Sequence, residues 1–106
     1  MADRVQVSHI LLMYEGSERS TATRSKEQAL VQIGELKDQL ATGGDFAALA
    51  KQHSDCPSGR EGGDLGTFPR GAMVPEFDAA AFALDVGADS DVVETAFGYH
   101  LIRRTG

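Results

Sequence analysis

Residues 4–12 read RVQVSHILL, and residues 99–104, at the other end of the chain, read YHLIRR. Apolar side chains recur at every second position of the first stretch, which is typical of a β-strand. Its second half is apolar on both faces, so we expect both faces to be covered there. Each stretch also carries one histidine, His9 or His100, among apolar neighbours. Because the first and last strands of a small sheet often pair at its centre, we expect these histidines to be neighbours.

Two helices are predicted after the first strand. Ser25 has the position of an N-cap, and Gln28 completes a capping box. Glycines at 43–44 end this helix, and Asp45 caps a second, shorter one. The polar residues 13–24 before the first helix lack any period and are expected to form a loop. Loops of this length are often functional.

The second half of the chain predicts short elements separated by turns. Residues 65–68 form a short strand, and Pro75 begins a third helix, which the sequence predicts to end at 86–87. Residues 91–95 and 99–104 are expected to form two strands joined by a tight turn. Helices between strands and a final antiparallel hairpin indicate an α+β domain with a small, mostly antiparallel sheet.

Length and composition narrow the class of protein. The 106 residues predict one domain, 1–106, large enough to fold without a metal or disulfide. The net charge of -6 argues against binding to nucleic acid, and also against anionic membranes. A single cysteine, Cys56, excludes an internal disulfide. No apolar run is long enough to span a membrane, and the N-terminus does not have the pattern of a signal peptide, so we expect a cytoplasmic location, with a domain of a longer exported protein as the alternative. We also expect a monomer.

Cysteine and histidine are the residues that suggest chemistry. Either histidine alone is compatible with a buried, hydrogen-bonded core residue. A Cys56 nucleophile is disfavoured because Asp55 is adjacent and no Lys or Arg lies within three residues. A zinc site from His9, His100, Cys56 and His53 lacks a closely spaced ligand pair. Cys56 is also compatible with a small buried hydrophobe.

A set of large apolar residues lies in or near the irregular segments: Leu65, Phe68, Met73, Phe77 and Phe97. Most such residues belong to a hydrophobic core. Leu65 and Met73, however, lie in glycine-rich segments without regular periodicity. Flexible side chains at such places can line a concave apolar site.

Four segments together resemble one family: SHILL at 8–12, FAALAKQHSDCPS at 46–58, GGDLGTFPRGAMVPEFDAAAFAL at 62–84 and TAFGYHLIRR at 95–104. They resemble the parvulin-type peptidyl-prolyl cis/trans isomerases. The resemblance implies the FKBP-like superfold, a four-stranded antiparallel sheet surrounded by about four helices, the fourth a single turn near Asp64. It also implies rotation about X-Pro bonds in proteins, assistance to folding, proline-containing segments as partners, and no metal or organic cofactor.

The resemblance also implies site residues. The implied catalytic residues are His9 and His100 as a histidine pair at the floor of the site, Thr95 as their hydrogen-bond partner, and Cys56 at a position that is Cys or Asp in the family. The implied grip on the proline ring comes from Leu65, Met73 and Phe77, with Phe97 as a further apolar wall. We expect Phe68 and Val74 to complete the substrate pocket. Val74 replaces a glutamine found in phosphate-directed members.

The loop at 13–24 bears on the substrate. Phosphate-directed members carry a cluster of Lys and Arg there. In this chain Arg19 and Arg24, the candidate weak anion contacts, are balanced by Glu15 and Glu18. We therefore expect an isomerase without phosphate dependence. The alternative is a non-catalytic peptide-binding or chaperone-like module that uses the same groove.

Overall fold

The structure, a computed structural model, describes residues 4–18, 20 and 22–106. Within these residues the elements follow in this order: β1 (Arg4–Leu12), α1 (Lys26–Ala41), α2 (Phe46–His53), the 3-10 turn η1 (Pro57–Glu61), β2 (Asp64–Pro69), α3 (Pro75–Ala83), β3 (Val93–Thr95) and β4 (Gly98–Arg104). This is the predicted α+β order. The implied fourth helix near Asp64 is the single turn η1.

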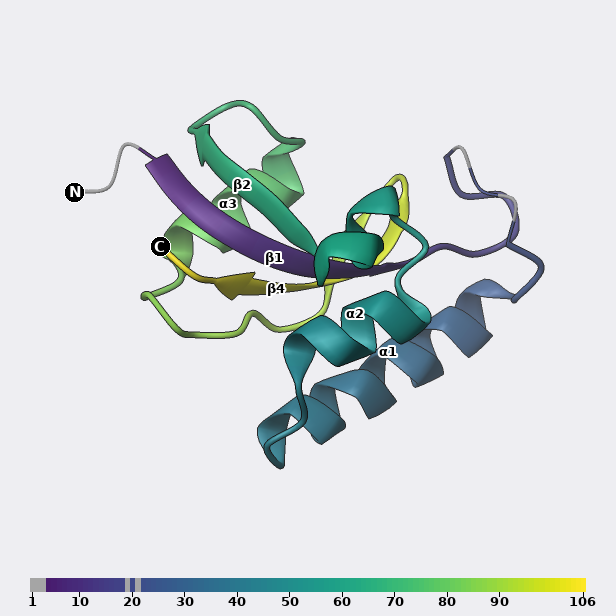
Figure 1. Cartoon of the computed structure of the whole chain (residues 1–106). Coiled ribbons are helices and arrows are strands. Elements are labelled where there is room, and N and C mark those ends of the chain that lie inside the picture. The colour runs from purple at the N-terminus through teal and green to yellow at the C-terminus, as the bar shows by residue number, and fades with distance from the viewer. Residues whose placement is uncertain (1–3, 19, 21) are drawn as a thin grey trace.

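The sheet is antiparallel throughout, with its strands in the order β2-β1-β4-β3. The first and last strands therefore pair at its centre, as the sequence predicts (Figure 1). In the register of this pair, His9 lies opposite Ile102, and Leu11 lies opposite His100. The two histidines are therefore diagonal neighbours on one face of the sheet.

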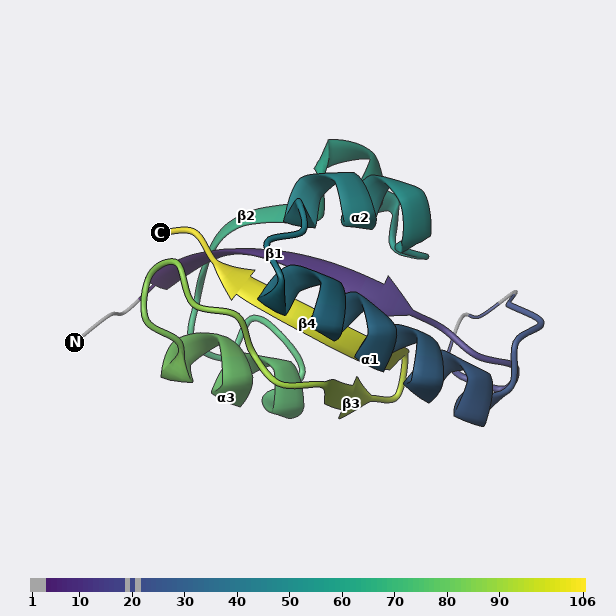
Figure 2. The same cartoon turned by 90° about the horizontal axis from the view of Figure 1, so that it is seen from below.

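Helices cover the sheet on both faces. Helices α1 and α2 pack on one face, and α3 lies on the other (Figures 1 and 2). Period-two alternation sends Ile10 and Leu12 into the core beneath α1 and α2, whereas Val5 and Val7 pack against the α3 side. The predicted capping box at the start of α1 and the Asp45 cap of α2 are both present.

The third helix ends earlier than predicted. It stops at Ala83, and Leu84 is already extended. The following backbone pairs with β4 instead: the Arg104 guanidinium donates to the Leu84 carbonyl at 2.8 Å, and Gly87 N–H donates to the Arg104 carbonyl at 2.7 Å. These partners satisfy backbone groups that another helical turn would have paired internally. The strand predicted at 91–95 is also shorter than expected and is regular only over Val93–Thr95.

Candidate active site

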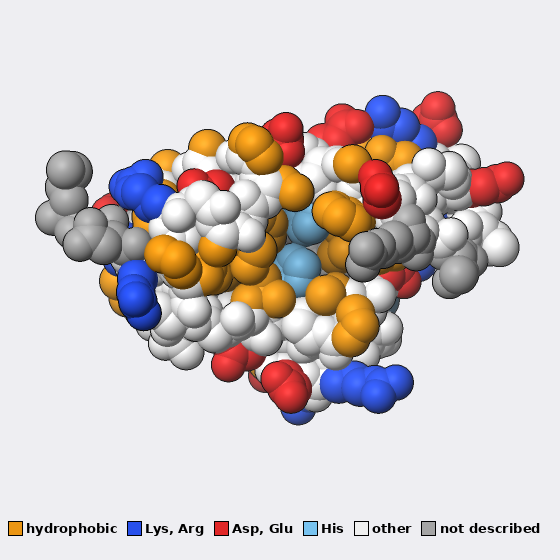
Figure 3. Space-filling model, turned by 90° about the horizontal axis from the view of Figure 1, so that it is seen from above, with side chains coloured by type: hydrophobic (Ala, Val, Ile, Leu, Met, Phe, Trp, Pro, Cys, Tyr) orange, Lys and Arg blue, Asp and Glu red, His pale blue; other side chains and the backbone are white. Residues whose placement is uncertain are grey.

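A hollow of about 280 Å³ opens on the α3 side of the sheet. Figure 3 shows the two histidines at its bottom, framed by hydrophobic side chains. Its lining consists of His9, Leu11, Met13, Cys56, Pro57, Leu65, Met73, Val74, Phe77, Phe97 and His100. Apart from the two histidines and Cys56, these side chains carry no ionisable group, so the hollow is an apolar pocket with a polar floor.

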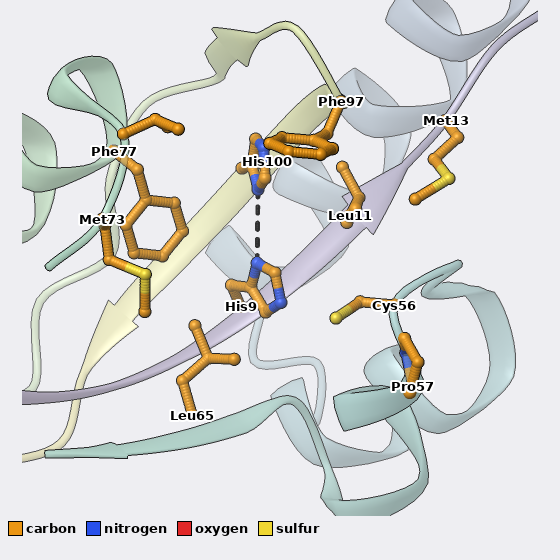
Figure 4. Close-up of a pocket in the computed structure, with 11 residues that line it drawn as sticks. His9, Leu11, Met13, Cys56, Pro57, Leu65, Met73, Phe77, Phe97 and His100 are labelled. Atoms are coloured by element: carbon orange, nitrogen blue, oxygen red, sulfur yellow. Dashed lines mark hydrogen bonds between the residues drawn. The ribbon is translucent and has the colours of Figure 1, made fainter. Parts of the chain in front are cut away.

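Several elements of the fold contribute side chains to the walls of the pocket. Figure 4 shows Met73 and Phe77 on one side of the histidines, and Cys56 and Pro57 on the opposite side. Phe97 comes from the turn between β3 and β4. The walls thus come from segments far apart in the sequence, whereas the two central strands supply the histidine floor and Leu11.

A continuous chain of hydrogen bonds runs beneath the pocket. Thr95 Oγ1 lies 2.7 Å from His100 Nε2, and the Nδ1 atoms of His100 and His9 are 3.2 Å apart (Figure 4). His9 Nε2 lies 3.2 Å from Ser58 Oγ. The Ser58 hydroxyl donates to Cys56 Sγ at 3.2 Å. The chain therefore connects β3, β4, β1 and η1 in one polar network.

One placement of hydrogens satisfies this whole network. The Ser58 hydroxyl uses its only hydrogen on the sulfur, so its oxygen accepts from His9 Nε2–H. His9 Nδ1 then accepts from His100 Nδ1–H, and His100 Nε2 accepts from the Thr95 hydroxyl. Both imidazoles are neutral in this arrangement. The sulfur of the cysteine is an acceptor within the network, which leaves its own S–H hydrogen available to the pocket.

Burial also favours neutral imidazoles. Both side chains are 4% exposed. Burial lowers the pKa of His9 from its ordinary value of 6.5 to about 4. For His100, burial and then the neighbouring His9 charge lower the pKa to about 3. At neutral pH the floor is therefore a fixed, uncharged hydrogen-bond network.

The phenylalanines have different positions. Phe77 stands edge-on to both histidine rings, with centroid distances of 5.6 Å to His9 and 5.4 Å to His100. Phe68, predicted to line the pocket, does not do so. It is buried behind Phe77, 6.3 Å away between ring centroids, and also packs on Phe82. Because its position on β2 points it into the core beneath α3, Phe68 supports the pocket wall without forming it.

The two candidate anion contacts have different outcomes. Arg19 lies outside the described residues. Arg24 is not directed at the pocket: its Nη1 donates to Asp55 Oδ2 at 2.5 Å and to the Met13 carbonyl at 2.9 Å. A guanidinium held by a carboxylate is neutralised locally, which weakens Arg24 as an anion contact; its role in anion binding stays a prediction.

Some pocket residues were missed by sequence reasoning. Leu11 shares the period-two face of His9, so that spacing could have found it. Pro57 and Ser58 follow Cys56 directly, but nothing local shows that the 3-10 turn places Pro57 in the pocket wall and Ser58 Oγ next to His9 Nε2. Met13 lies just beyond β1, in a segment without periodicity.

Two kinds of structure are absent from the part of the chain that is described. No group of three His, Cys, Asp or Glu side chains there is arranged to hold a metal ion. No helix there has the length and apolar character to cross a membrane.

Comparisons with known proteins give the same family as the site. The PPIC-type PPIase domain matches residues 1–106. Peptidyl-prolyl cis-trans isomerase Pin1 of Digitalis lanata is 39% identical, over 99% of this chain and 98% of that protein. Foldase protein PrsA 4 of Bacillus cereus is 43% identical over 96% of this chain, which spans 31% of the foldase. The solved structure of peptidyl-prolyl isomerase ESS1 from Candida albicans matches with a TM-score of 0.91 at 35% identity, covering 98% of this chain and 63% of that one.

The fold and site define a class of α+β domain with an apolar pocket over a pair of buried, hydrogen-bonded histidines. This chain belongs to the PPIC-type, or parvulin-type, family of peptidyl-prolyl cis/trans isomerases. It is an isomerase that acts on proline-containing peptide segments.

Proposed function

We propose that this isomerase acts on X-Pro bonds in which X is an apolar residue, and that it needs no phosphate on its substrate. The observation that carries the proposal is the composition of the pocket lining, which contains no Lys, Arg, Asp or Glu. An apolar side chain before proline can be buried against Leu11, Met13 and Phe97. A phosphate placed there would lose water without gaining a cation.

The pocket suits rotation about an amide bond. The barrier is about 18–20 kcal/mol and comes from the double-bond character of C–N. No covalent bond forms or breaks during rotation, so no nucleophile is required. Burying the amide disfavours its charge-separated resonance form and lowers that double-bond character. Leu65, Met73 and Phe77 hold the proline ring, so that the preceding carbonyl can swing.

Polar groups at one edge can stabilise the twisted amide preferentially. The S–H of Cys56 lies at that edge, and Ser58 and His9 hold its sulfur in place through the network. The neutral histidines do not transfer protons in this proposal. They fix the position of the cysteine and close the floor against water.

Charge near the pocket also supports phosphate independence. Arg24 is paired with Asp55, so its charge is compensated at the rim. The exposed Val74 sits where phosphate-directed members carry glutamine, which removes a polar contact to substrate. The net charge of -6 adds a mild repulsion of anionic peptides.

The test is kcat/KM for matched peptides with Leu, Ser, phosphoserine or Lys before proline, at low and high salt. We expect Leu to be favoured and phosphoserine to be no better than Ser. A tenfold phosphoserine advantage that fades with salt would overturn the proposal. The variant Met13→Lys is a positive control, because it places a cation at the rim and should raise the phosphoserine rate relative to the serine rate.

We propose further that the protein acts as a monomer and does not bind nucleic acid. The net charge of -6 disfavours contact with phosphate backbones. Light scattering after gel filtration tests the monomer, and a mobility-shift assay with duplex DNA and RNA tests the second point.

A further inference from the structure

The edge of β1 beyond β2 is covered by residues on both sides of η1. His9 N–H donates to the Gly63 carbonyl at 2.9 Å. Farther along the same edge, Leu11 N–H donates to Ser54 Oγ at 3.1 Å, and its carbonyl accepts from Asp55 N–H at 2.7 Å. Segment 54–55 thereby satisfies backbone groups that would otherwise be unpaired at the strand end.

The Asp55 carboxylate extends this pairing past the end of the strand. Its Oδ2 accepts from Met13 N–H at 2.8 Å and from Arg24 Nη1 at 2.5 Å. The same Nη1 donates to the Met13 carbonyl at 2.9 Å. Both groups of the Met13 backbone are therefore held by one ion pair. The Arg24 carbonyl accepts from Glu15 N–H at 2.8 Å, which closes the base of the 13–24 loop.

Neither member of this ion pair lines the pocket, but the residues they hold do. Leu11 and Met13 form one part of the wall, and Cys56 follows Asp55 directly. Figure 4 shows Leu11, Met13 and Cys56 on the same side of the histidines. The ion pair thus fixes the spacing between the end of β1 and the cysteine-bearing segment.

We propose that Arg24 and Asp55 are positioning residues for the isomerase reaction: together they brace the wall formed by Leu11, Met13 and Cys56. The brace acts on every X-Pro substrate, because it sets the shape of the wall and contacts no particular side chain. It depends on the isomerase activity and not on the substrate preference proposed above.

A direct anion-binding role for Arg24 makes the opposite prediction for one variant. If Arg24 bound phosphate, Asp55 would compete with the substrate for it, so Asp55→Asn would help phosphoserine peptides and Arg24→Met would harm them. If the pair is a brace, both variants weaken activity in the same direction on all peptides. The sign of the Asp55→Asn effect therefore separates the two roles.

The experiment compares Arg24→Met, Arg24→Lys, Asp55→Asn and the double variant Arg24→Met/Asp55→Asn on Leu-Pro and phosphoserine-Pro peptides. We expect Arg24→Met and Asp55→Asn each to lower kcat/KM about fivefold on both peptides, mainly through KM, because wall contacts bind ground and transition states alike. The double variant should have the same kcat/KM as the less active of the two single variants, because either single change already breaks the ion pair. Arg24→Lys keeps the charge and should recover activity to within about twofold.

A remote ion pair provides the matched control. Lys37 and Asp91 are 2.6 Å apart between Nζ and Oδ1, on the surface away from the pocket lining. The control variants Lys37→Met and Asp91→Asn should leave kcat and KM unchanged. Asp55→Asn keeps a side-chain oxygen for the Met13 amide, so a folded test protein is available even if Arg24→Met unfolds.

Three results would overturn the brace. One is an unchanged KM in both single variants. Another is a loss of activity that disappears once the folded fraction is corrected for. The third is an opposite sign of the two variants on the phosphoserine peptide, which would restore the anion site. A wild-type protein inactive on every peptide would instead contradict the isomerase function, so the two failures are distinguishable.

Discussion

Lowering the pH should destabilise this protein at pH values well above those at which carboxylates become protonated. His9 and His100 are buried and neutral, with pKa values of about 4 and about 3 in the folded protein. In the unfolded chain both return to an ordinary pKa near 6.5. Between those limits the unfolded chain binds protons that the folded protein does not bind. Stability therefore falls as the pH falls below 6.5, and this contribution is absent well above 6.5.

The size of the effect follows from the two pKa values. A pH of 5 lies about 1.5 units below the pKa of an imidazole in the unfolded chain. Protonation at this pH therefore stabilises the unfolded chain by about 2 kcal/mol for each histidine. The two histidines together should lower the free energy of unfolding by about 4 kcal/mol between pH 7 and pH 5. That is a large part of the roughly 5–15 kcal/mol that holds a small domain together.

Urea unfolding at pH 7, 6 and 5 measures this directly. A His9→Gln variant, less stable at pH 7, should lose about half of the pH dependence, since one of the two titrating groups is gone. NMR of the imidazole carbons gives a second readout, in which neither buried ring should titrate between pH 8 and pH 5. The reasoning is refuted if the free energy of unfolding changes by less than about 1 kcal/mol between pH 7 and pH 5, or if either ring titrates near its ordinary value of about 6.5.

Other predictions concern the network and its support. Cys56→Ala should keep a measurable fraction of kcat/KM and Cys56→Asp should do at least as well, because rotation needs no nucleophile; complete loss in a folded Cys56→Ala protein would contradict this. His100→Ala should lower stability by about 1–3 kcal/mol for each partner left unpaired, so its melting temperature should fall together with its rate, whereas an inactive variant of unchanged stability would point to proton transfer. Gly63→Ala should disrupt the site, because its Cβ would lie 2.3 Å from the His9 carbonyl oxygen at a φ of +87°. Gly66→Ala is the control for that variant: it has a similar φ of +73° but open space around its Cβ, so its loss of stability, measured by thermal melting, should be smaller.

The sequence alone determined the elements and the faces of the central strands. Alternation over nine residues predicts that His9 shares a face with Val7 and Leu11, and the capping box predicts where α1 begins. These signals are local, because strand periodicity and helix caps involve residues within a few positions of one another. The expected pairing of the first and last strands predicted that the histidines are neighbours, and resemblance to the family implied that Thr95 joins them.

Tertiary structure decided which of these residues work together. The β1–β4 register brings His9 and His100 within hydrogen-bond distance across 91 positions of sequence. Pairing of the chain after Leu84 with β4 ended α3 early, and the packing of Phe68 behind Phe77 removed it from the pocket.

The ion pair of Arg24 with Asp55 was likewise decided by the tertiary structure. The two residues are 31 positions apart, and the charges of the 13–24 loop give no sign that one of its arginines is held at the end of β1. Contacts of this kind depend on how whole elements dock, since the edge groups of a strand accept whatever segment packing brings beside them. The local sequence therefore predicted most residues of the site, whereas the sheet register and helix packing determined which of them contact one another.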